Sequence, residues 1–204
     1  MLSSALHGSR QIFDKIFVNV WFRKAYHFIA GGLLVALVVV LDRQWFSAFC
    51  LFWLGVFAVM SKRVSTAVLG LFLLNTLSSK FVTLGSAVIF VVGDGVATVV
   101  GSAFGDKKWP WHSKKTILGS LSFFICASLA MVGVLQLMIP SPPRNLLMFA
   151  ILPSLIGCVA EALPFALRDI RDLSPDDNLL VILSSGVSLY FLTKFFHPHI
   201  PPGW

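Results

Sequence analysis

The sequence predicts an all-α fold: a polytopic membrane helix bundle of about seven spans with its N-terminus in the cytoplasm. Composition is the first reason, because 57% of the 204 residues are apolar and 12% are charged, against about 45–50% and about 25% in soluble domains. Long apolar runs along the whole chain are the second reason. The third is that the loops between these runs alternate in charge.

Seven apolar runs are candidate spans, because each approaches the roughly 20 residues that cross the hydrocarbon core of a bilayer. The third run is the shortest, so it is either a span or a tilted, partly buried segment. The runs cover residues 25–41, 44–60, 64–77, 81–104, 117–139, 145–166 and 179–196.

Lys and Arg accumulate in the cytoplasmic loops of membrane proteins, and this bias sets the orientation. A cytoplasmic N-terminus places twelve basic residues inside: Arg10, Lys15, Arg23, Lys24, Lys62, Arg63, Lys107, Lys108, Lys114, Lys115, Arg168 and Arg171. Four then lie outside: Arg43, Lys80, Arg144 and Lys194. We therefore expect the N-terminus inside and the C-terminus outside. The same bias accounts for the net charge of +7 without a nucleic-acid partner.

This organisation gives one membrane-embedded domain over 25–196, preceded by a cytoplasmic segment at 1–24 and followed by an outer tail at 197–204. We expect no cleavable signal peptide, because the first segment is polar and basic. Apolar residues recur at helical spacing from Ile12 to Trp21. This segment therefore either lies on the cytoplasmic leaflet as an interfacial helix or continues into the first span.

The fourth span contains an acid, Asp94, between two glycines. An ionisable residue inside a span is costly and marks a candidate functional site. Counted from residue 81 at about 1.5 Å per residue, Asp94 lies roughly 20 Å down, in the cytoplasmic half of the bilayer. Gly93 and Gly95 weaken the helix, which favours a broken helix around a bound ion or phosphate. A ridge of small residues spaced by four also predicts close packing with another helix: Gly93, Ala97, Gly101 and Gly105.

A basic loop follows this span and ends in Ser113-Lys-Lys-Thr116, directly before the next apolar run. Backbone amides at a helix start, together with Lys ammonium groups, form an anion site suited to a polyphosphate. The alternative interpretation is an ordinary solvated loop that obeys the positive-inside bias.

Three other polar clusters lie at the same predicted depth: Arg23, Lys24 and His27; Glu161; and Asp176, Asp177 and Asn178. Each has a structural explanation when taken alone, such as a helix N-cap for Asp177. Together they place acids, an amide and basic groups on one cytoplasmic face. This combination suits a magnesium–polyphosphate complex, because Mg²⁺ binds one or two carboxylates plus phosphate oxygens.

The order and spacing of these residues closely resemble the CTP-dependent lipid-alcohol kinases, which include dolichol, phytol and farnesol kinases and the diacylglycerol kinase of yeast. The resemblance covers about 25–180. The matching residues are Arg23, Lys24, His27, Gly93-Asp94-Gly95, Ala97, Gly101, Gly105, Lys108-Trp109-Pro110, Lys114-Lys115-Thr116, Gly119-Ser120, Ala160-Glu161-Ala162-Leu163 and Asp177-Asn178-Leu179. One departure is Leu118, where the family usually has Glu, and it leaves the nucleotide preference open.

The resemblance implies phosphoryl transfer from CTP, with Mg²⁺ as cofactor, to a membrane-embedded isoprenoid alcohol such as a polyprenol, dolichol, phytol or farnesol. It implies these catalytic residues: Asp94, Lys115, Glu161 and His27. It implies these nucleotide-binding residues: Arg23, Gly93, Gly95, Lys108, Lys114, Lys115, Thr116 and Gly119. The implied metal ligands are Asp94, Glu161, Asp177 and Asn178. Asp94 can instead be the base that accepts the proton of the lipid hydroxyl.

Three other functions remain open from the residues. The first is cytidylyl transfer to phosphatidate, since the phosphatidate cytidylyltransferases share the Lys-Lys-Thr loop. The second is CTP-dependent phosphorylation of diacylglycerol. The third is an anion transporter with the basic loop at its mouth, although such transporters show internal repeats and none is visible here.

Overall fold

The computed structural model describes residues 24–60, 62–111, 115–138, 145–163 and 177–196. The predicted cytoplasmic segment, apart from Lys24, and the predicted outer tail lie outside these ranges. Within them the all-α prediction is confirmed: a helix over Lys24–Val40 is followed by six more. These are α2 (Arg43–Met60), α3 (Lys62–Leu77), α4 (Lys80–Phe104), α5 (Ile117–Met138), α6 (Leu146–Ala162) and α7 (Asp177–Phe196).

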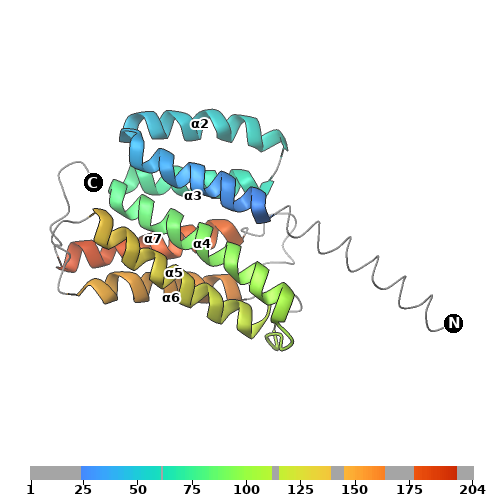
Figure 1. The fold of residues 1–204 in the computed structure, drawn as a ribbon. Helices are drawn as coiled ribbons and strands as arrows, with labels where there is room; N and C mark the ends of the chain where they lie inside the picture. The colour runs from blue at the N-terminus through green and yellow to red at the C-terminus, as the bar shows by residue number, and fades with distance from the viewer. Residues whose placement is uncertain (1–23, 61, 112–114, 139–144, 164–176, 197–204) are drawn as a thin grey trace.

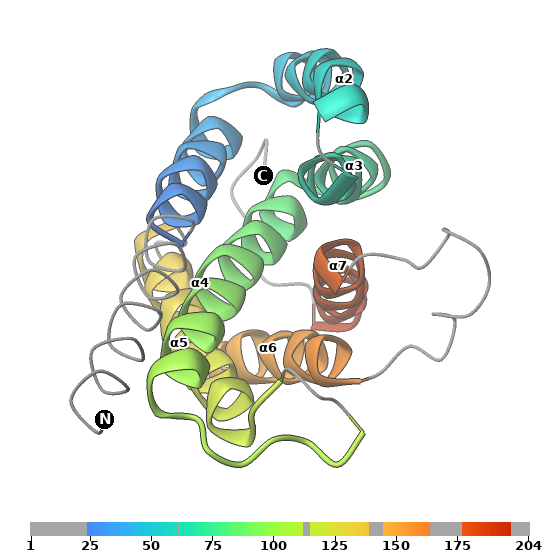
Figure 2. The ribbon, with the colours of Figure 1, turned by 90° about the vertical axis from the view of Figure 1, so that its right-hand side faces the viewer.

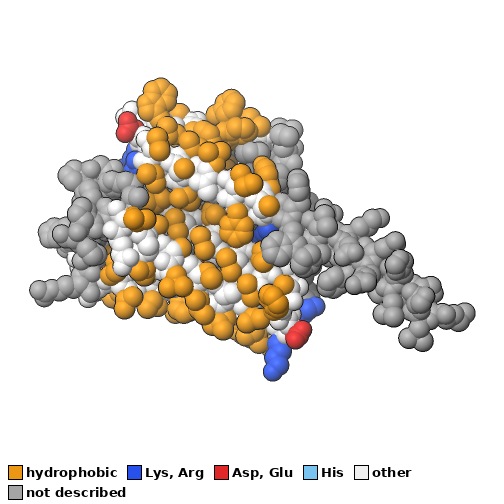
Figure 3. Space-filling view, in the orientation of Figure 1, with side chains coloured by type: hydrophobic (Ala, Val, Ile, Leu, Met, Phe, Trp, Pro, Cys, Tyr) orange, Lys and Arg blue, Asp and Glu red, His pale blue; other side chains and the backbone are white. Residues whose placement is uncertain are grey.

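Three of the described helices are long and apolar enough to cross a membrane, and they lie at Lys80–Phe104, Ile117–Leu137 and Asp177–Phe196. Shorter apolar helices cover Lys24–Val40, Thr66–Leu77 and Leu146–Ala162. In Figure 3 the side of the bundle is mostly hydrophobic, and charged side chains lie toward its two ends. This architecture fits a helical membrane protein.

Helix α4 lies in the middle of the bundle, between the Lys24–Val40 helix, α3, α5, α6 and α7 (Figure 2). Helix α2 packs on α3 at the periphery (Figure 1). The first half of α4 is buried without interruption from Phe81 to Val91. A helix that is apolar on all sides and central is expected to carry the core, which matches the position of α4.

The small-residue ridge of α4 packs against the first turns of α5, as its spacing predicts. A Cβ atom on Gly119 of α5 would lie 2.9 Å from the carbonyl oxygen of Ala97, and one on Gly101 would lie 2.7 Å from Thr116 Oγ1. Both distances are shorter than real Cβ contacts, so glycine at these positions lets the two helices approach closely.

The prediction of a broken helix at Asp94 is wrong, because α4 runs continuously from Lys80 to Phe104. The glycines beside Asp94 make room for aromatic rings instead. A Cβ atom on Gly93 would lie 2.6 Å from the ring of Phe123, and one on Gly95 would lie 2.4 Å from the ring of Phe28. Aromatic packing therefore holds this stretch in a helix despite the low helix propensity of glycine.

Helix α6 ends at Ala162, four residues before the end of the predicted apolar run. Leu163 has extended backbone angles, with φ −73° and ψ 135°. The following residue is Pro164, and a proline disfavours the helical conformation of the residue before it.

At the end of the bundle where α4 begins, basic side chains bind the carbonyl groups that terminate helices. Lys80 Nζ donates to Val39 O at 2.9 Å, and Arg43 donates to Asn75 O and Thr76 O at 2.5 and 2.6 Å. Carbonyls in the last turn of a helix have no partner within it, so these contacts stabilise the helix ends.

Candidate active site

The candidate site lies beside the second half of α4, where four segments bring charged side chains together. Asp94 comes from α4, Lys24 and His27 from the first turn of the Lys24–Val40 helix, and Glu161 from the last turn of α6. Lys115 comes from the loop before α5, and Asp177 is the first residue of α7. The sequence separates these segments by up to about 150 residues, and the fold assembles them in one region.

Asp94 forms a mostly buried ion pair with Lys24. Lys24 Nζ lies 2.9 Å from Asp94 Oδ2, and the two side chains are 10% and 19% exposed. A lysine is costly to bury unless its charge is compensated. The carboxylate of Asp94 provides this compensation, so the pair fixes the start of the Lys24–Val40 helix at the depth of Asp94.

His27 lies one helical turn after Lys24 and completes this half of the site. Its Nε2 atom is 3.3 Å from Val91 O and 3.7 Å from Asp94 Oδ2. A carbonyl oxygen can only accept a hydrogen bond, so Nε2 carries the proton and donates to Val91. The remaining ring nitrogen, Nδ1, is then the atom of His27 that can accept a proton.

Lys115 joins two acids from different helices. Its ammonium group pairs with Glu161 Oε1 and lies 3.4 Å from Asp177 Oδ2. The Glu161 side chain is only 5% exposed, whereas that of Asp177 is 53% exposed. Burial lowers the pKa of Lys115, but Glu161 and, to a smaller extent, Asp177 and Asp94 raise it by more, so this pKa lies above its usual range. Lys115 is therefore a fixed positive charge among three carboxylates.

The loop between α4 and α5 folds back on itself and thereby positions Lys115. Lys108 and Thr116 form an antiparallel bridge, Trp109 N donates to Lys115 O, and Ile117 N donates to Lys107 O. The side chains of Lys107 and Lys108 are exposed. Exposed ammonium groups of this kind can bind anions.

Two tryptophans attach this loop to the helices below it. Trp109 and Trp111 stack with ring centroids 4.9 Å apart. Trp109 Nε1 donates to Ser120 Oγ of α5 at 2.9 Å, and Trp111 Nε1 donates to Ala162 O of α6 at 3.0 Å. Because Ala162 follows Glu161, the second hydrogen bond holds the loop next to the acid that Lys115 binds.

Several predicted nucleotide ligands have packing roles in the structure. Thr116 Oγ1 accepts a hydrogen bond from Gly119 N, which caps α5, and both residues are buried against α4. Gly93 and Gly95 are covered by Phe123 and Phe28. Their predicted role in nucleotide binding stays a prediction.

Other predicted residues are placed less centrally or are not described. Asn178 is half-buried in the first turn of α7, beside Asp177. Arg23 and Lys114, both predicted to bind nucleotide, lie outside the described residues. Their roles stay predictions.

Among the described residues, no group of three or more His, Cys, Asp or Glu side chains is arranged to hold a metal. The chemistry of the donor set nevertheless fits a magnesium ion. Glu161 and Asp177 both place a carboxylate oxygen at one cation, the ammonium group of Lys115. Mg²⁺ prefers such hard oxygen ligands and takes the rest of its coordination from water and phosphate.

Three residues of this site are not among the site residues that the sequence predicts. Lys24 is one, although its i,i+3 spacing from His27 puts both on one helix face. From the sequence, Trp109 is recognisable only as part of the Lys108-Trp109-Pro110 motif, and Trp111 has no predicted role. Their position between lysines in a short loop was the available signal, since paired indoles beside a charged site have both packing and hydrogen-bonding capacity.

Comparison with known proteins gives one relevant relative. The chain is 30% identical over 105 residues to "Farnesol kinase, chloroplastic" of Arabidopsis thaliana, a match that covers 49% of this chain and 32% of the relative. The chain thus matches about a third of that protein's length. No family model matches the chain, and no solved structure matches it. The similarity over half of the chain supports kinship with an isoprenoid-alcohol kinase.

Proposed function

We propose that this chain is a membrane kinase that transfers the terminal phosphate of CTP to the hydroxyl group of an isoprenoid alcohol. The single observation that carries the proposal is Lys115, which joins Glu161 of α6 to Asp177 of α7 beside the Lys24–Asp94 pair. The similarity to farnesol kinase supports the acceptor class. The choice of CTP rests on the resemblance of the Lys108 to Gly119 motif.

The candidate site contains both lysines and carboxylates. This combination suits phosphoryl transfer, which needs positioning and charge neutralisation more than covalent chemistry from the protein. Lys107, Lys108 and Lys115 would bind the triphosphate. Glu161 and Asp177 are the carboxylates that would hold Mg²⁺, and Asp94 and Asn178 are the further ligands that the resemblance implies. Bound Mg²⁺ would neutralise charge on the phosphate oxygens.

In the proposed reaction the alcohol oxygen attacks the γ-phosphorus of CTP and forms a new P–O bond. The bond from the γ-phosphorus to the β–γ bridging oxygen breaks, and CDP leaves with its electron pair. The hydroxyl proton goes to a nearby base. His27 Nδ1 and the Asp94 carboxylate are the two candidates, because both lie in the half of the site that borders the Lys24–Val40 helix.

The proposed site has one side toward water and one toward lipid, as the two substrates require. CTP is soluble and charged, and the loop that carries Lys107 and Lys108 is exposed. The alcohol lies in the bilayer with its hydroxyl near the headgroups. Helices α6 and α7, which carry Glu161 and Asp177, present large exposed apolar side chains, among them Leu155 and Phe191.

The test uses the purified full chain in lipid nanodiscs with γ-labelled or α-labelled CTP. With farnesol or a longer polyprenol, γ-labelled CTP should give a labelled lipid monophosphate and CDP, and α-labelled CTP should leave the lipid unlabelled. Transfer of α-label to phosphatidate would replace the proposal with cytidylyl transfer. Transfer of γ-label to diacylglycerol alone would change the acceptor class.

A lysine variant links the activity to the proposed site. Lys115→Met should reduce turnover at least roughly a hundredfold, the scale expected when a positioned transition-state charge is lost. Lys194→Met is the matched control, because Lys194 lies in the last turn of α7, far along the helix from Asp177. It should retain wild-type activity. Equal activity of both variants would contradict the assignment of Lys115.

A further inference from the structure

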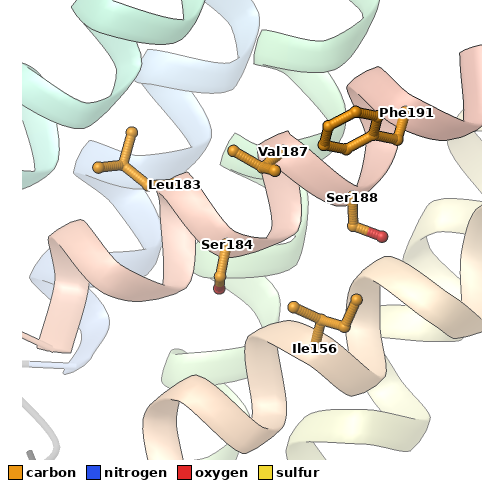
Figure 4. A pocket seen from close by; sticks show the side chains of 6 residues that line it. All are labelled: Ile156, Leu183, Ser184, Val187, Ser188 and Phe191. Atoms are coloured by element: carbon orange, nitrogen blue, oxygen red, sulfur yellow. The ribbon is translucent and has the colours of Figure 1, made fainter. Parts of the chain in front are cut away.

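We infer that the groove between α6 and α7 binds the hydrocarbon chain of the isoprenoid alcohol and directs its hydroxyl end toward Glu161 and Lys115. This inference rests on the proposed function and deepens it, because it assigns the acceptor subsite. The groove has a volume of about 450 Å³ and is lined by Ile156, Leu183, Ser184, Val187, Ser188 and Phe191 (Figure 4).

The groove lies on the face of α7 that does not pack on α3 and α4. A Cβ atom on Gly186 would lie 2.5 Å from Leu74 of α3, and Leu189 Cδ1 would lie 2.6 Å from a Cβ atom on Gly85 of α4. The lining residues of α7 recur at i, i+1, i+4, i+5 and i+8, which is one helix face. That face turns away from α3 and α4 and toward α6 and the surroundings.

Small side chains make the groove hollow. Ser184 and Ser188 point toward α6, and larger apolar residues stand beside them (Figure 4). Val187 and Phe191 are 49% and 53% exposed. A chain lying between these walls would therefore contact both helices and still be open to the bilayer, from which a lipid alcohol must enter.

The groove begins within about two helical turns of the candidate active site on both helices. Ile156 precedes Glu161 by five residues, which is about 8 Å along α6, and Leu183 follows Asp177 by six residues, about 9 Å along α7. The lining then extends to Phe191, about 12 Å further along α7. A prenyl chain that reaches past the near end of the groove by this distance would bring its hydroxyl group to the charged cluster.

Ser188 is a polar residue in the wall of this otherwise apolar groove. Its side chain is more than nine-tenths buried, and its Oγ has no hydrogen-bond partner among the described residues. The choice of an isoprenoid chain as the occupant rests on the proposed function and on the similarity to farnesol kinase.

The groove would act by positioning the acceptor, because a bilayer is already as apolar as a side chain such as Leu. Moving a prenyl chain from lipid into the groove gains little from hydrophobic transfer. Correct placement of the hydroxyl group has a much larger effect on the reaction rate, since a misplacement of about 1 Å can lower that rate roughly a hundredfold. The effect of blocking the groove should therefore depend on chain length.

Ser184→Phe tests this, because Ser184 is only half-buried and a phenyl ring there would fill the groove without displacing the core. We expect kcat/KM to fall roughly tenfold to a hundredfold for a long polyprenol and to stay within about twofold for a short, soluble prenol. Leu129→Phe, at an exposed position of α5 outside the groove, should behave as wild type. Equal effects of Ser184→Phe on long and short alcohols would overturn the inference.

Photo-crosslinking provides a readout that needs no phosphoryl transfer. A polyprenol with a photoreactive group at its far end should label peptides from α6 or α7 in wild type and lose this labelling in Ser184→Phe. Labelling of α2 or α3 instead would overturn the groove assignment while the kinase proposal stands. Labelling of α6 and α7 without turnover of any alcohol would leave the groove in place and refute the kinase. Competition by diacylglycerol but not by polyprenol would overturn the choice of an isoprenoid.

Discussion

Lys24 Nζ lies 2.9 Å from Asp94 Oδ2, although 70 residues separate the two in the sequence. The pair joins the start of the first described helix to the middle of α4, and His27 borders it at 3.7 Å. A partly buried pair of this kind contributes little net stability compared with apolar packing, but removing one partner leaves the other charge uncompensated and destabilises the protein. Because the pair adds little net stability and lies at the proposed site, we interpret it as part of the binding or catalytic machinery.

Asp94→Asn should abolish turnover, with a loss of at least roughly a hundredfold, because it removes a charge at the site of phosphoryl transfer. It should also destabilise the protein, since Lys24 is left without its carboxylate. Breaking a fully buried pair costs about 3–5 kcal/mol, and the 19% exposure of Asp94 makes the cost here smaller. Turnover with labelled CTP and thermal unfolding in detergent measure the two effects.

The double variant Lys24→Met/Asp94→Asn separates stability from function. It should recover most of the unfolding temperature lost by Asp94→Asn, because no unpaired lysine remains, and it should stay inactive. Asp42→Asn is the matched control at an exposed position before α2, and it should change neither quantity. Near-normal activity in a folded Asp94→Asn protein would reduce Asp94 to a packing residue.

Gly119→Ala should destabilise the contact between α4 and α5. The added methyl group would lie 2.9 Å from Ala97 O and 3.4 Å from Gly101 Cα, both backbone atoms that cannot rotate away. Overpacking of this kind costs about 1–3 kcal/mol. The unfolding temperature of the purified protein measures it.

Gly133→Ala is the control for the glycine experiment, because it lies in the same helix and a Cβ atom there would meet nothing within 4 Å. Alanine is the better helix former by about 0.5–1 kcal/mol, so this variant should be neutral or slightly stabilised. A similar loss of stability in both variants would show that helix α5 does not depend on the close approach at Gly119.

The sequence is sufficient to locate the helices along the chain, but it does not show which face of each helix packs against which neighbour. The apolar run at 81–104 corresponds to α4 at Lys80–Phe104, because the length of an apolar run is a local property of the sequence. The partner of Asp94 is not local. Arg23 and Lys24 are adjacent and differ by about 100° around a helix, so the choice between them depends on how that helix packs on α4.

The spacing of the glycines predicted a close contact between helices, but not which side chains lie beside Asp94. The ridge from Gly93 to Gly105 predicted a close helix contact, and Gly101 does contact α5. The sequence could not show what would fill the space beside Asp94, because Phe28 and Phe123 come from separate helices. A glycine next to a charged residue is therefore compatible with either a ligand or an aromatic ring.

Trp111→Phe should weaken nucleotide binding more than it weakens folding. The substitution preserves an aromatic ring for Trp109 but removes the hydrogen bond to Ala162 O, which is worth about 0.5–1.5 kcal/mol. Because this hydrogen bond holds the loop near Glu161, its loss should raise the KM for CTP roughly threefold to tenfold. Steady-state kinetics at saturating alcohol measure this value.

Trp45→Phe is the control for the loop experiment, because Trp45 is 69% exposed in the first turn of α2. It should leave the KM for CTP unchanged. A KM rise for the acceptor alcohol rather than for CTP in Trp111→Phe would mean that the loop positions the lipid instead of the nucleotide.

Membrane orientation can be tested at two exposed acids, Asp42 and Asp106. Helix α4 begins near the first and ends next to the second, and its 25 residues span about 37 Å, so the two positions lie at opposite ends of the bundle. The excess of Lys and Arg near Asp106 predicts that this end faces the cytoplasm.

In a variant with Cys50, Cys126 and Cys158 replaced by Ala, we expect a membrane-impermeant maleimide applied to intact cells to label Asp42→Cys and not Asp106→Cys. Permeabilised cells should show labelling of both. Labelling of Asp106→Cys alone in intact cells would reverse the orientation and place the proposed nucleotide loop on the side of the membrane that lacks CTP, which would contradict both the topology and the proposed donor.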